Sequence, residues 1–539
     1  MTTTVELLPE RTVYPAGAPV RVEVRGAGGP GVLRVLHLGA VRAERAVDGD
    51  GFADLGALPP GGYGVELALD GGPVARTAVH VTEDPRTALR YGFVVDYRPG
   101  RDVTAVTDNL RRLHLTAVQF YDWAYRHADL LGGGEEYEDA LGQPVALDSV
   151  RALVEGCHAV GSDALGYAAV YAVGPREWAG WEHDALLTPG GQPYGLGDFL
   201  FLLDPAAPDW LDHFTGDLAG AVRQAGFDGF HLDQYGYPKR AHRPDGEPVD
   251  VAASFTTLIH RVHGELPDAR LVFNNVNDFP TWATARTPQD AVYIEVWEPS
   301  TGLEHLAHVV TRARAEAGGK PVVIAAYQHV YDSAPAPAAD LATALTMATL
   351  HSHGATHLLC GEADRILVDP YYVRNHTVEP STAALLRRWY DFLVEHADLL
   401  GAPDAADVTA SYAGGYNDDL DVSYRATPVG QFAAPGAVWR RITRVGDRLV
   451  VHLINLSGQD DTRWDAPRNT PADPGPGTLR LRKSGPGLPR VRVADPDRSA
   501  HLVDVPVTDE GDWARAVLPA PHLWQLVLID PDHLTLGAG

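Results

Sequence analysis

The chain has 539 residues, of which 45% are hydrophobic and 21% charged, so it can bury sizeable cores, and its length suggests about three domains. Its net charge of −27 argues against nucleic acid and anionic membrane surfaces as partners, because both require basic patches. The two cysteines, Cys157 and Cys360, provide neither a disulfide framework nor a CxxC metal motif. A neutral ligand such as a sugar is compatible with this composition.

The beginning of the chain, MTTTVELLPE, has no basic segment followed by an apolar run, so no signal peptide is visible. No run of about 18 apolar residues predicts a transmembrane helix. We therefore expect a cytoplasmic protein, or a secreted one if the natural chain begins with a signal that this sequence lacks.

Residues 1–88 alternate apolar and polar side chains over short stretches such as VRVEVRG (20–26) and GVLRVLHLG (31–39), with Gly/Pro turns between them. This period of two predicts antiparallel strands, and we expect an immunoglobulin-like β-sandwich. Short alternating stretches between Pro, Gly and Asp turns return after residue 401. They predict a second antiparallel sandwich over residues 401–539.

Between these sandwiches, apolar runs alternate with segments of helical periodicity, which is typical of parallel strands joined by helices. We expect strands at 91–97, 117–123, 164–173, 228–234, 270–277, 291–298, 321–328 and 355–362. Eight such units favour a closed (β/α)8 barrel over residues 89–400. A doubly wound open sheet is less favoured, because no GxGxxG motif follows the first strand.

Polar and aromatic residues gather at the carboxyl ends of the expected barrel strands, which converge on one mouth of a barrel. Aromatic faces suit the apolar faces of a sugar ring, and amides and carboxylates suit its hydroxyls. The candidate substrate-binding residues are Tyr121, Asp122, Trp123, Tyr171, Gln234, Asn274, Asn277, Trp297, Tyr327, Gln328 and Glu362.

Two carboxylates in this set, Asp233 on the fourth strand and Glu295 on the sixth, could carry out glycoside hydrolysis as a nucleophile and a proton donor. Structural roles are the alternatives: Asp233 could cap the next helix, and either carboxylate could pair with an arginine. Glu298, three residues further on, could replace Glu295 as the acid. The distance between the carboxylates would decide between a retaining and an inverting reaction.

Metal and cofactor motifs are weak or absent in the sequence. His351, His353 and His357 lack HExxH or HxxEH spacing, so packing roles are expected for them. There is no GxSxG elbow, Walker A motif or dinucleotide fingerprint. We expect no metal ion and no cofactor.

Five stretches together resemble glycoside hydrolase family 66, which contains dextranases and cycloisomaltooligosaccharide glucanotransferases. They are QFYDWAYRHADLL (119–131), GFDGFHLDQYG (226–236), FNNVN (273–277), YIEVWE (293–298) and GEADRILVDPYY (361–372). The resemblance covers roughly residues 90–400 and implies a barrel between two β-sandwiches. It implies retaining cleavage of α-1,6 linkages with Asp233 as nucleophile and Glu295 as acid/base. Tyr121 and Asp122 would hold the glucose at the cleavage point, and Asn274, Asn277 and Glu362 are weaker assignments.

One departure from the family concerns the segment after the seventh strand, where its cyclising members carry a large carbohydrate-binding insertion. Here only residues 330–339 and a helix separate strands seven and eight, which favours hydrolysis over cyclisation. The missing signal peptide is a second departure, because secreted dextranases meet the polymer outside the cell, whereas an intracellular enzyme would meet imported isomaltooligosaccharides. A barrel enzyme or transglycosylase acting on another α-glycoside, and a non-catalytic glycan-binding protein, are the alternatives.

Overall fold

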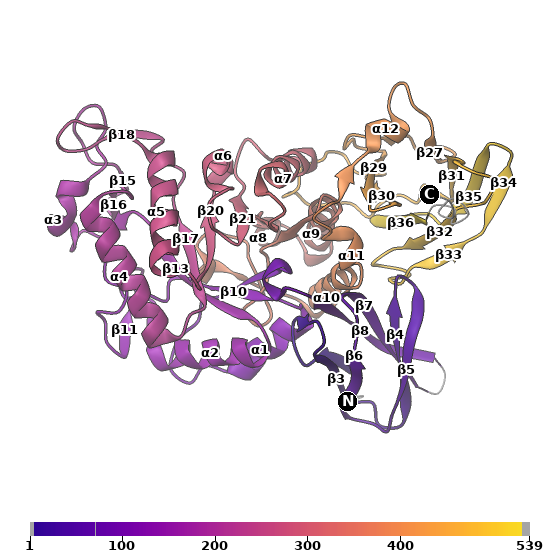
Figure 1. The fold of residues 1–539 in the computed structure, drawn as a ribbon, viewed down its shortest axis with the longest axis horizontal. Helices are drawn as coiled ribbons and strands as arrows, with labels where there is room; N and C mark the ends of the chain where they lie inside the picture. Colours follow the sequence, from indigo (N-terminus) through magenta and orange to yellow (C-terminus); the bar gives the residue numbers. More distant parts are fainter. Residues whose placement is uncertain (1–4, 70–71, 531–539) are drawn as a thin grey trace, which may run out of the picture.

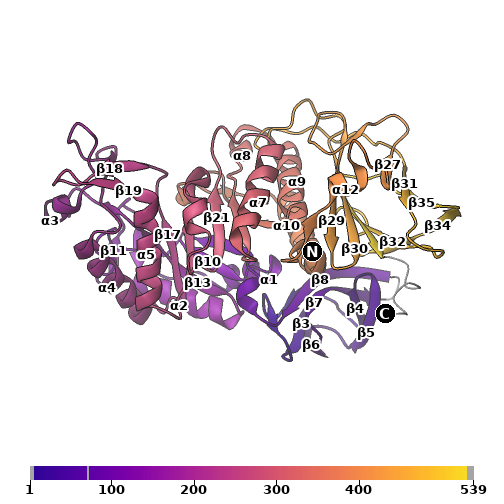
Figure 2. The same cartoon turned by 45° about the horizontal axis from the view of Figure 1, so that its top comes forward.

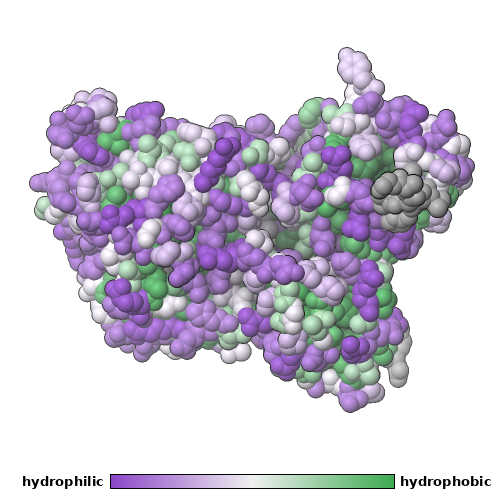
Figure 3. Space-filling view, viewed as in Figure 1, coloured by the Kyte–Doolittle hydropathy of each residue, from purple (hydrophilic) through white to green (hydrophobic). Residues whose placement is uncertain are grey.

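The computed structural model describes residues 5–69 and 72–530. A central barrel lies beside two β-sandwiches, and both sandwiches pack on the same side of it (Figures 1 and 2). Hydrophilic residues cover most of the face seen in Figure 3, in keeping with the high net charge. Within the described ranges, no helix has the length and apolar character needed to span a bilayer.

The N-terminal sandwich consists of two sheets, with strand orders β1-β3-β6 and β2-β8-β7-β4-β5. Inward and outward side chains alternate along β3, as the sequence pattern predicts. The strands are β1 (Glu6–Pro9), β2 (Tyr14–Pro15), β3 (Pro19–Arg25), β4 (Gly31–His37), β5 (Ala40–Val47), β6 (Gly51–Ala57), β7 (Gly61–Leu69) and β8 (Gly72–Thr82).

Eight parallel strands form the barrel, each paired with its neighbour in chain order. They are β9 (Tyr91–Val94), β10 (Ala117–Phe120), β13 (Asp163–Ala169), β17 (Gly229–Asp233), β20 (Arg270–Asn274), β21 (Ala291–Glu295), β22 (Val322–Ala325) and β23 (Ala355–His357). An isolated bridge between Phe93 of the first strand and Gly361, in the segment after the last strand, links the two ends of the sheet, and the Phe93 N–H donates to the Cys360 carbonyl at 3.2 Å. The barrel is therefore nearly closed.

The strands end earlier than the sequence predicts, so the predicted extents are wrong at the carboxyl ends. The expected strand 355–362 stops at His357, and 291–298 stops at Glu295. The polar side chains after each apolar run therefore lie either at the last residue of the strand, as Asp233, Asn274 and Glu295 do, or in the loop that follows it.

Seven main helices pack on the barrel strands: α1 (Val103–Arg112), α2 (Leu147–Ala159), α4 (Pro208–Ala225), α5 (Val251–Glu265), α7 (Leu303–Ala317), α9 (Ala336–Ser352) and α10 (Pro380–Glu395). Helix α4 begins with a proline and ends at Gly226, whose φ of 83° is the left-handed conformation that glycine adopts easily. The expected helix 382–400 is divided at His396 into α10 and α11 (Ala397–Leu400).

Short hairpins and helices extend the loops at the carboxyl ends of the barrel strands, and they supply much of the wall of the mouth. The hairpin strands are β11 (Glu136–Glu138), β12 (Pro144–Ala146), β14 (Ala172–Val173), β15 (Gly195–Leu196), β16 (Leu200–Leu202), β18 (Arg240–His242), β19 (Pro248–Asp250), β24 (Arg365–Ile366) and β25 (His376–Thr377). The short helices are α3 (Trp178–Trp181), α6 (Thr281–Thr284) and α8 (Val330–Ser333).

The C-terminal sandwich has one sheet of order β26-β29-β30-β36-β32-β33, with β28 beside β29, and a second of order β27-β31-β35-β34. Its strands are β26 (Ala406–Asp407), β27 (Leu420–Ser423), β28 (Val429–Gly430), β29 (Val438–Val445), β30 (Arg448–Asn455), β31 (Gly477–Arg482), β32 (Arg490–Ala494), β33 (Val503–Val505), β34 (Val507–Glu510), β35 (Trp513–Leu518) and β36 (Trp524–Asp530). The predicted architecture of a barrel between two β-sandwiches is confirmed.

Side chains from all three parts meet at the carboxyl end of α10. The buried carboxylate of Glu395 accepts hydrogen bonds from Arg76 of β8 at 2.8 Å and from His501 at 2.6 Å. The other ring nitrogen of His501 lies 2.6 Å from Glu66 of β7. The sandwiches are thus tied to the barrel and to each other at its rear, away from the mouth.

Candidate active site

Three neighbouring barrel strands end in side chains that contact one another. Asp233 ends β17 and Glu295 ends β21, and Asn274 ends β20, the strand between them. Nδ2 of Asn274 donates to Oδ1 of Asp233 at 2.7 Å and to Oε2 of Glu295 at 2.9 Å. One amide therefore holds both predicted catalytic carboxylates, because parallel neighbours of equal length bring their carboxyl ends to one place.

Neutral groups surround these carboxylates. The Tyr167 hydroxyl, from β13, donates to Oδ2 of Asp233 at 2.7 Å. Burial raises the pKa of Asp233 above its usual value, although the hydrogen bonds from Asn274 and Tyr167 partly oppose this. Burial and then the negative charge of Asp233 raise the pKa of Glu295, against the hydrogen bonds from Asn274, Tyr327 and Trp297. Such a pair favours a state with one proton between two carboxyl groups.

The carboxylates lie in a cavity of about 460 Å³ at the mouth of the barrel. Tyrosine, tryptophan and phenylalanine supply ten of its 23 lining residues. Tyr121 stacks on Tyr372 with ring centres 4.2 Å apart, and Trp297 lies 5.7 Å from Tyr327. Rings and neutral amides around two carboxyl groups form a site for a neutral molecule with apolar faces and hydroxyls.

The structure brings eight of the predicted residues to this cavity: Asp233, Glu295, Tyr121, Asp122, Gln234, Asn274, Trp297 and Tyr327. Asp122, the second residue after β10, has a φ of 46°, an uncommon conformation for a residue other than glycine. Burial, followed by the charges of Asp139 and Asp233, raises the pKa of Asp122 well above its usual value. Gln234 is buried, and its amide donates to the carbonyls of Asn274 and Phe279.

Four predicted residues do not line the cavity and contact other protein groups instead. Trp123 is fully buried, and its indole N–H donates to the Tyr167 carbonyl at 3.2 Å. The Tyr171 hydroxyl donates to the Tyr237 carbonyl at 2.6 Å. Asn277 is exposed and donates to the Glu298 carbonyl, and buried Gln328 accepts from Thr343. These contacts give all four residues a supporting position around the site.

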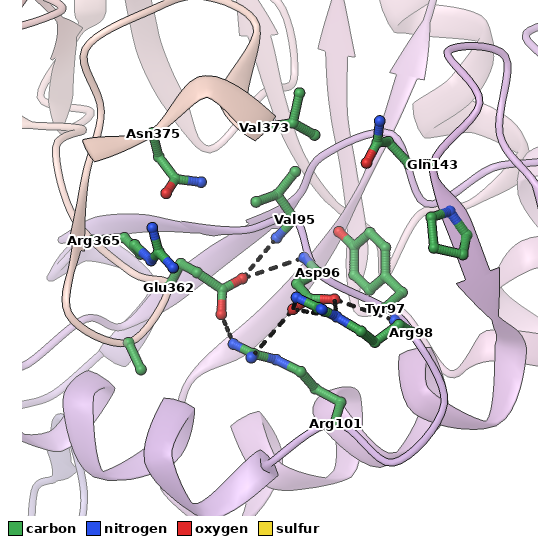
Figure 4. Close-up of a pocket in the computed structure, with 12 residues that line it drawn as sticks. Val95, Asp96, Tyr97, Arg98, Arg101, Gln143, Glu362, Arg365, Val373 and Asn375 are labelled. Atoms are coloured by element: carbon green, nitrogen blue, oxygen red, sulfur yellow. Dashed lines mark hydrogen bonds and ion pairs between the residues drawn. The ribbon is translucent and has the colours of Figure 1, made fainter. Parts of the chain in front are cut away.

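Glu362 lines a second cavity (Figure 4), separate from the one that holds Asp233 and Glu295. Its Oε2 accepts the N–H groups of Val95 and Asp96 at 3.0 and 3.3 Å, and its other oxygen pairs with Arg101. The carboxylate thus supplies the acceptor that a longer last strand would have offered to the first strand. Glu362 closes the seam of the barrel, next to the isolated bridge between Phe93 and Gly361.

Several cavity residues were not among the predicted site residues. Loops or strand interiors supply Tyr167, His127, Leu196, Phe199, His231, Tyr235, Tyr371 and Tyr372. A sequence signal was present only for the tyrosines, because Tyr167 lies near the end of the third strand and the others follow strands four and eight. Leu196 and Phe199 come from the β15–β16 hairpin, inside a long loop whose path is decided by tertiary contacts.

Three histidines that lie close together in the sequence, as metal ligands often do, contact backbone carbonyls instead. His351 contacts the Ala355 carbonyl, and His353 the Thr349 carbonyl. His357 contacts the carbonyl of residue 326. Over residues 5–69 and 72–530, no group of three or more His, Cys, Asp or Glu side chains could hold a metal ion.

Comparison with known proteins identifies relatives with named activities. The chain is 26% identical over 302 residues to a cycloisomaltooligosaccharide glucanotransferase of Niallia circulans, covering 50% of this chain and 31% of the relative. It is 26% identical over 156 residues to a dextranase of Streptococcus salivarius, covering 25% of this chain and 19% of the relative. The matched parts thus span less than a third of these relatives.

Among solved structures, a Paenibacillus cycloisomaltooligosaccharide glucanotransferase complexed with cycloisomaltoheptaose shares the fold, with a TM-score of 0.86 and 19% identity over 97% of this chain and all of that one. An α-amylase of Geobacillus thermoleovorans is more distant, with a TM-score of 0.54 and 13% identity over 84% of this chain and all of the amylase. A family model described as "Glycosyl hydrolase family 66" matches residues 59–528. The match extends over the barrel and most of the C-terminal sandwich, and the chain therefore belongs to glycosyl hydrolase family 66.

Proposed function

We propose that the protein is a retaining glycoside hydrolase that cleaves α-1,6-glucosidic linkages of dextran or isomaltooligosaccharides. Asp233 is the nucleophile and Glu295 the general acid/base. The observation that carries this proposal is the Asn274 amide, which is hydrogen-bonded to both carboxylates inside the aromatic cavity.

The shared amide limits the separation of the two carboxylates. Two oxygens that each lie within 2.9 Å of one nitrogen cannot be more than twice that distance apart. This limit is below the roughly 6.5–9.5 Å between carboxyl groups of inverting enzymes and compatible with the roughly 5–5.5 Å of retaining ones. The short separation of Oδ1 of Asp233 and Oε2 of Glu295 supports the retaining assignment.

In the first step, protonated Glu295 gives its proton to the glycosidic oxygen while Asp233 attacks the anomeric carbon. The carbon–oxygen bond to the leaving chain breaks and a glucosyl ester of Asp233 forms. In the second step, the Glu295 carboxylate removes a proton from water, and the resulting oxygen nucleophile displaces Asp233. Both side chains return to their starting protonation states.

The neutral partners of Asp233 have a role in both steps. Tyr167 and Asn274 donate to its two oxygens and orient the carboxylate for attack. Asn274 also contacts Glu295, so loss of the Asp233 charge on ester formation changes the field at the acid/base. Without that charge, Glu295 becomes a weaker base and a stronger acid, as proton donation to the leaving oxygen requires.

The linkage assignment is supported by the names of the relatives, a dextranase and a cycloisomaltooligosaccharide glucanotransferase. A sugar hydroxyl in place of water in the second step would give the glucanotransferase reaction, which is the second candidate. Hydrolysis is favoured because only α8, α9 and short connections lie between β22 and β23. That segment leaves no room for a further domain.

Incubation with dextran and, separately, isomaltotetraose tests the proposal, with products resolved by chromatography and the first-formed anomer identified by proton NMR. We expect short isomaltooligosaccharides in the α configuration. Products of higher mass than the substrate would favour transglycosylation. A β first product would overturn the retaining mechanism, and no cleavage of either substrate would overturn the substrate class.

A further inference from the structure

We propose that the cavity shown in Figure 4, the second cavity, binds a further part of the glucan chain whose scissile bond lies in the catalytic cavity. This inference rests on the function proposed above. The second cavity measures about 430 Å³, within the range of small-molecule sites. Its walls come from the segments that follow β9, β10 and β23, so it opens on the same mouth of the barrel as the catalytic cavity.

The two cavities share a thin wall made by two chain segments. In one segment, Tyr371 and Tyr372 line the catalytic cavity, whereas Val373 and Asn375 line the second. The other segment contributes Leu141 to the catalytic cavity and Gln143 to the second.

A contact between side chains joins these segments at the wall. The Gln143 side chain lies beside the half-exposed Tyr371. The same two segments therefore line both cavities. A chain that leaves the catalytic cavity over Tyr371 enters the second cavity directly.

The charged floor of the second cavity is neutralised internally. Arg98 makes a bidentate contact with Asp96 at 2.6–3.0 Å, and Arg101 contacts both Asp96 and Glu362. Each carboxylate therefore already has a guanidinium partner. The arginines would repel an added cation, and the two carboxylates would repel an added multivalent anion. The cavity therefore favours a neutral ligand over either ion.

Uncharged amides and one further guanidinium remain above this floor. Asn375 uses its Nδ2 on the Tyr372 carbonyl at 2.8 Å, and its amide oxygen remains to accept a hydrogen bond. Arg365 donates to the Thr377 hydroxyl at 2.6 Å and has further N–H donors. Planar amide and guanidinium groups pair well with adjacent hydroxyls, which a neutral glucan presents along its whole length.

The test fills the second cavity without touching the catalytic one. Ala363→Trp and, independently, Val373→Trp each place an indole among its lining residues, and Val503→Trp, at a half-exposed position of β33 in the C-terminal sandwich, is the matched control. All three are made in an Asp233→Asn background, which prevents turnover. Dissociation constants for isomaltotriose and for dextran are measured by calorimetry.

We expect the two cavity variants to weaken dextran binding about tenfold, equivalent to about 1.4 kcal/mol, while isomaltotriose binding and the control remain unchanged. Unchanged dextran affinity in both folded cavity variants overturns the inference, and so does an equal loss for both ligands. The proposed function is tested by a different measurement. It fails if the wild-type chain cleaves neither dextran nor isomaltotetraose, whatever the cavity variants bind.

Discussion

Two pairs of carboxylates lie at the mouth of this barrel, and their surroundings differ. Asp233 and Glu295 have an amide and hydroxyl groups as partners, and their pKa values are raised. Asp96 and Glu362 instead have arginine side chains as their partners. Burial would raise the pKa of Asp96, but the hydrogen bonds from Arg98 and the nearby charge of Arg101 lower it.

Both pairs lie at or shortly after the carboxyl ends of barrel strands, and both consist of one aspartate and one glutamate. The difference shows that residue type and strand-end position do not decide the chemistry. A carboxylate held by arginine is stabilised in its charged form and contributes structure, whereas one held by neutral donors can gain and lose a proton near neutral pH.

Asp233→Ala is expected to show the largest effect, a fall of about 10⁴-fold or more in kcat/KM on dextran, because no other group can form the glucosyl ester. The rate is measured by release of reducing sugar. Far-UV circular dichroism that matches the wild type is the control for folding. Substantial activity in the folded variant would remove Asp233 from the nucleophile role.

Glu295→Gln keeps the shape of the side chain but cannot donate a proton, and a fall of about 10²–10⁴-fold in kcat is expected on glucan. A glucosyl fluoride needs no protonation of its leaving group, so formation of the glucosyl enzyme from it should be nearly unaffected. Single-turnover fluoride release measures this step. An equal loss on both substrates would contradict the acid/base assignment.

Asn274→Ala should lower kcat by about 10²-fold, because it removes the donor shared by both carboxylates and with it their alignment. The hydrogen bonds from Asn274 lower both pKa values, so both should rise in the variant. The pH profile of kcat/KM is then displaced to higher pH. If kcat falls but the pH dependence of kcat/KM does not shift, Asn274 has only a packing role.

Arg101→Met tests the other pair, because it leaves the buried Glu362 carboxylate without its cation. A loss of roughly 2–3 kcal/mol in the free energy of unfolding is expected from urea denaturation, with kcat changed less than about threefold. Glu362→Gln, which removes the charge instead, should destabilise less. A large fall in kcat at unchanged stability would give this pair a direct part in catalysis.

The smallest expected effect concerns stability at the catalytic pair. The folded chain raises the pKa of Glu295 above its unfolded value, so the protonated form is favoured in the fold, and stability is lost as pH rises from about 4.5 through the raised value. The Glu295→Gln variant does not lose stability in this way, because the glutamine side chain does not ionise. Its Tm should exceed that of the wild type by roughly 2–4 °C at pH 8, and the difference should vanish near pH 4. A difference independent of pH would contradict the raised pKa.

The order of strands and helices could be predicted from the sequence, because the period of two in the sandwiches and the alternation in the barrel are local patterns. Asp233, Asn274 and Glu295 could be predicted for a related reason: each ends an apolar run, and the carboxyl ends of parallel strands meet at one mouth. Family resemblance added the expected roles.

What lies around these three residues was decided by tertiary structure. Trp123 and Tyr171 carry the same strand-end signal as Tyr121, yet the turn of the chain after each strand directs them into the packing behind the wall. Leu196 and Phe199 reach the cavity only because a hairpin in a long loop folds over it. Glu362 became a seam residue because the last strand stops at His357, and the first strand then needs an acceptor that no local pattern could predict.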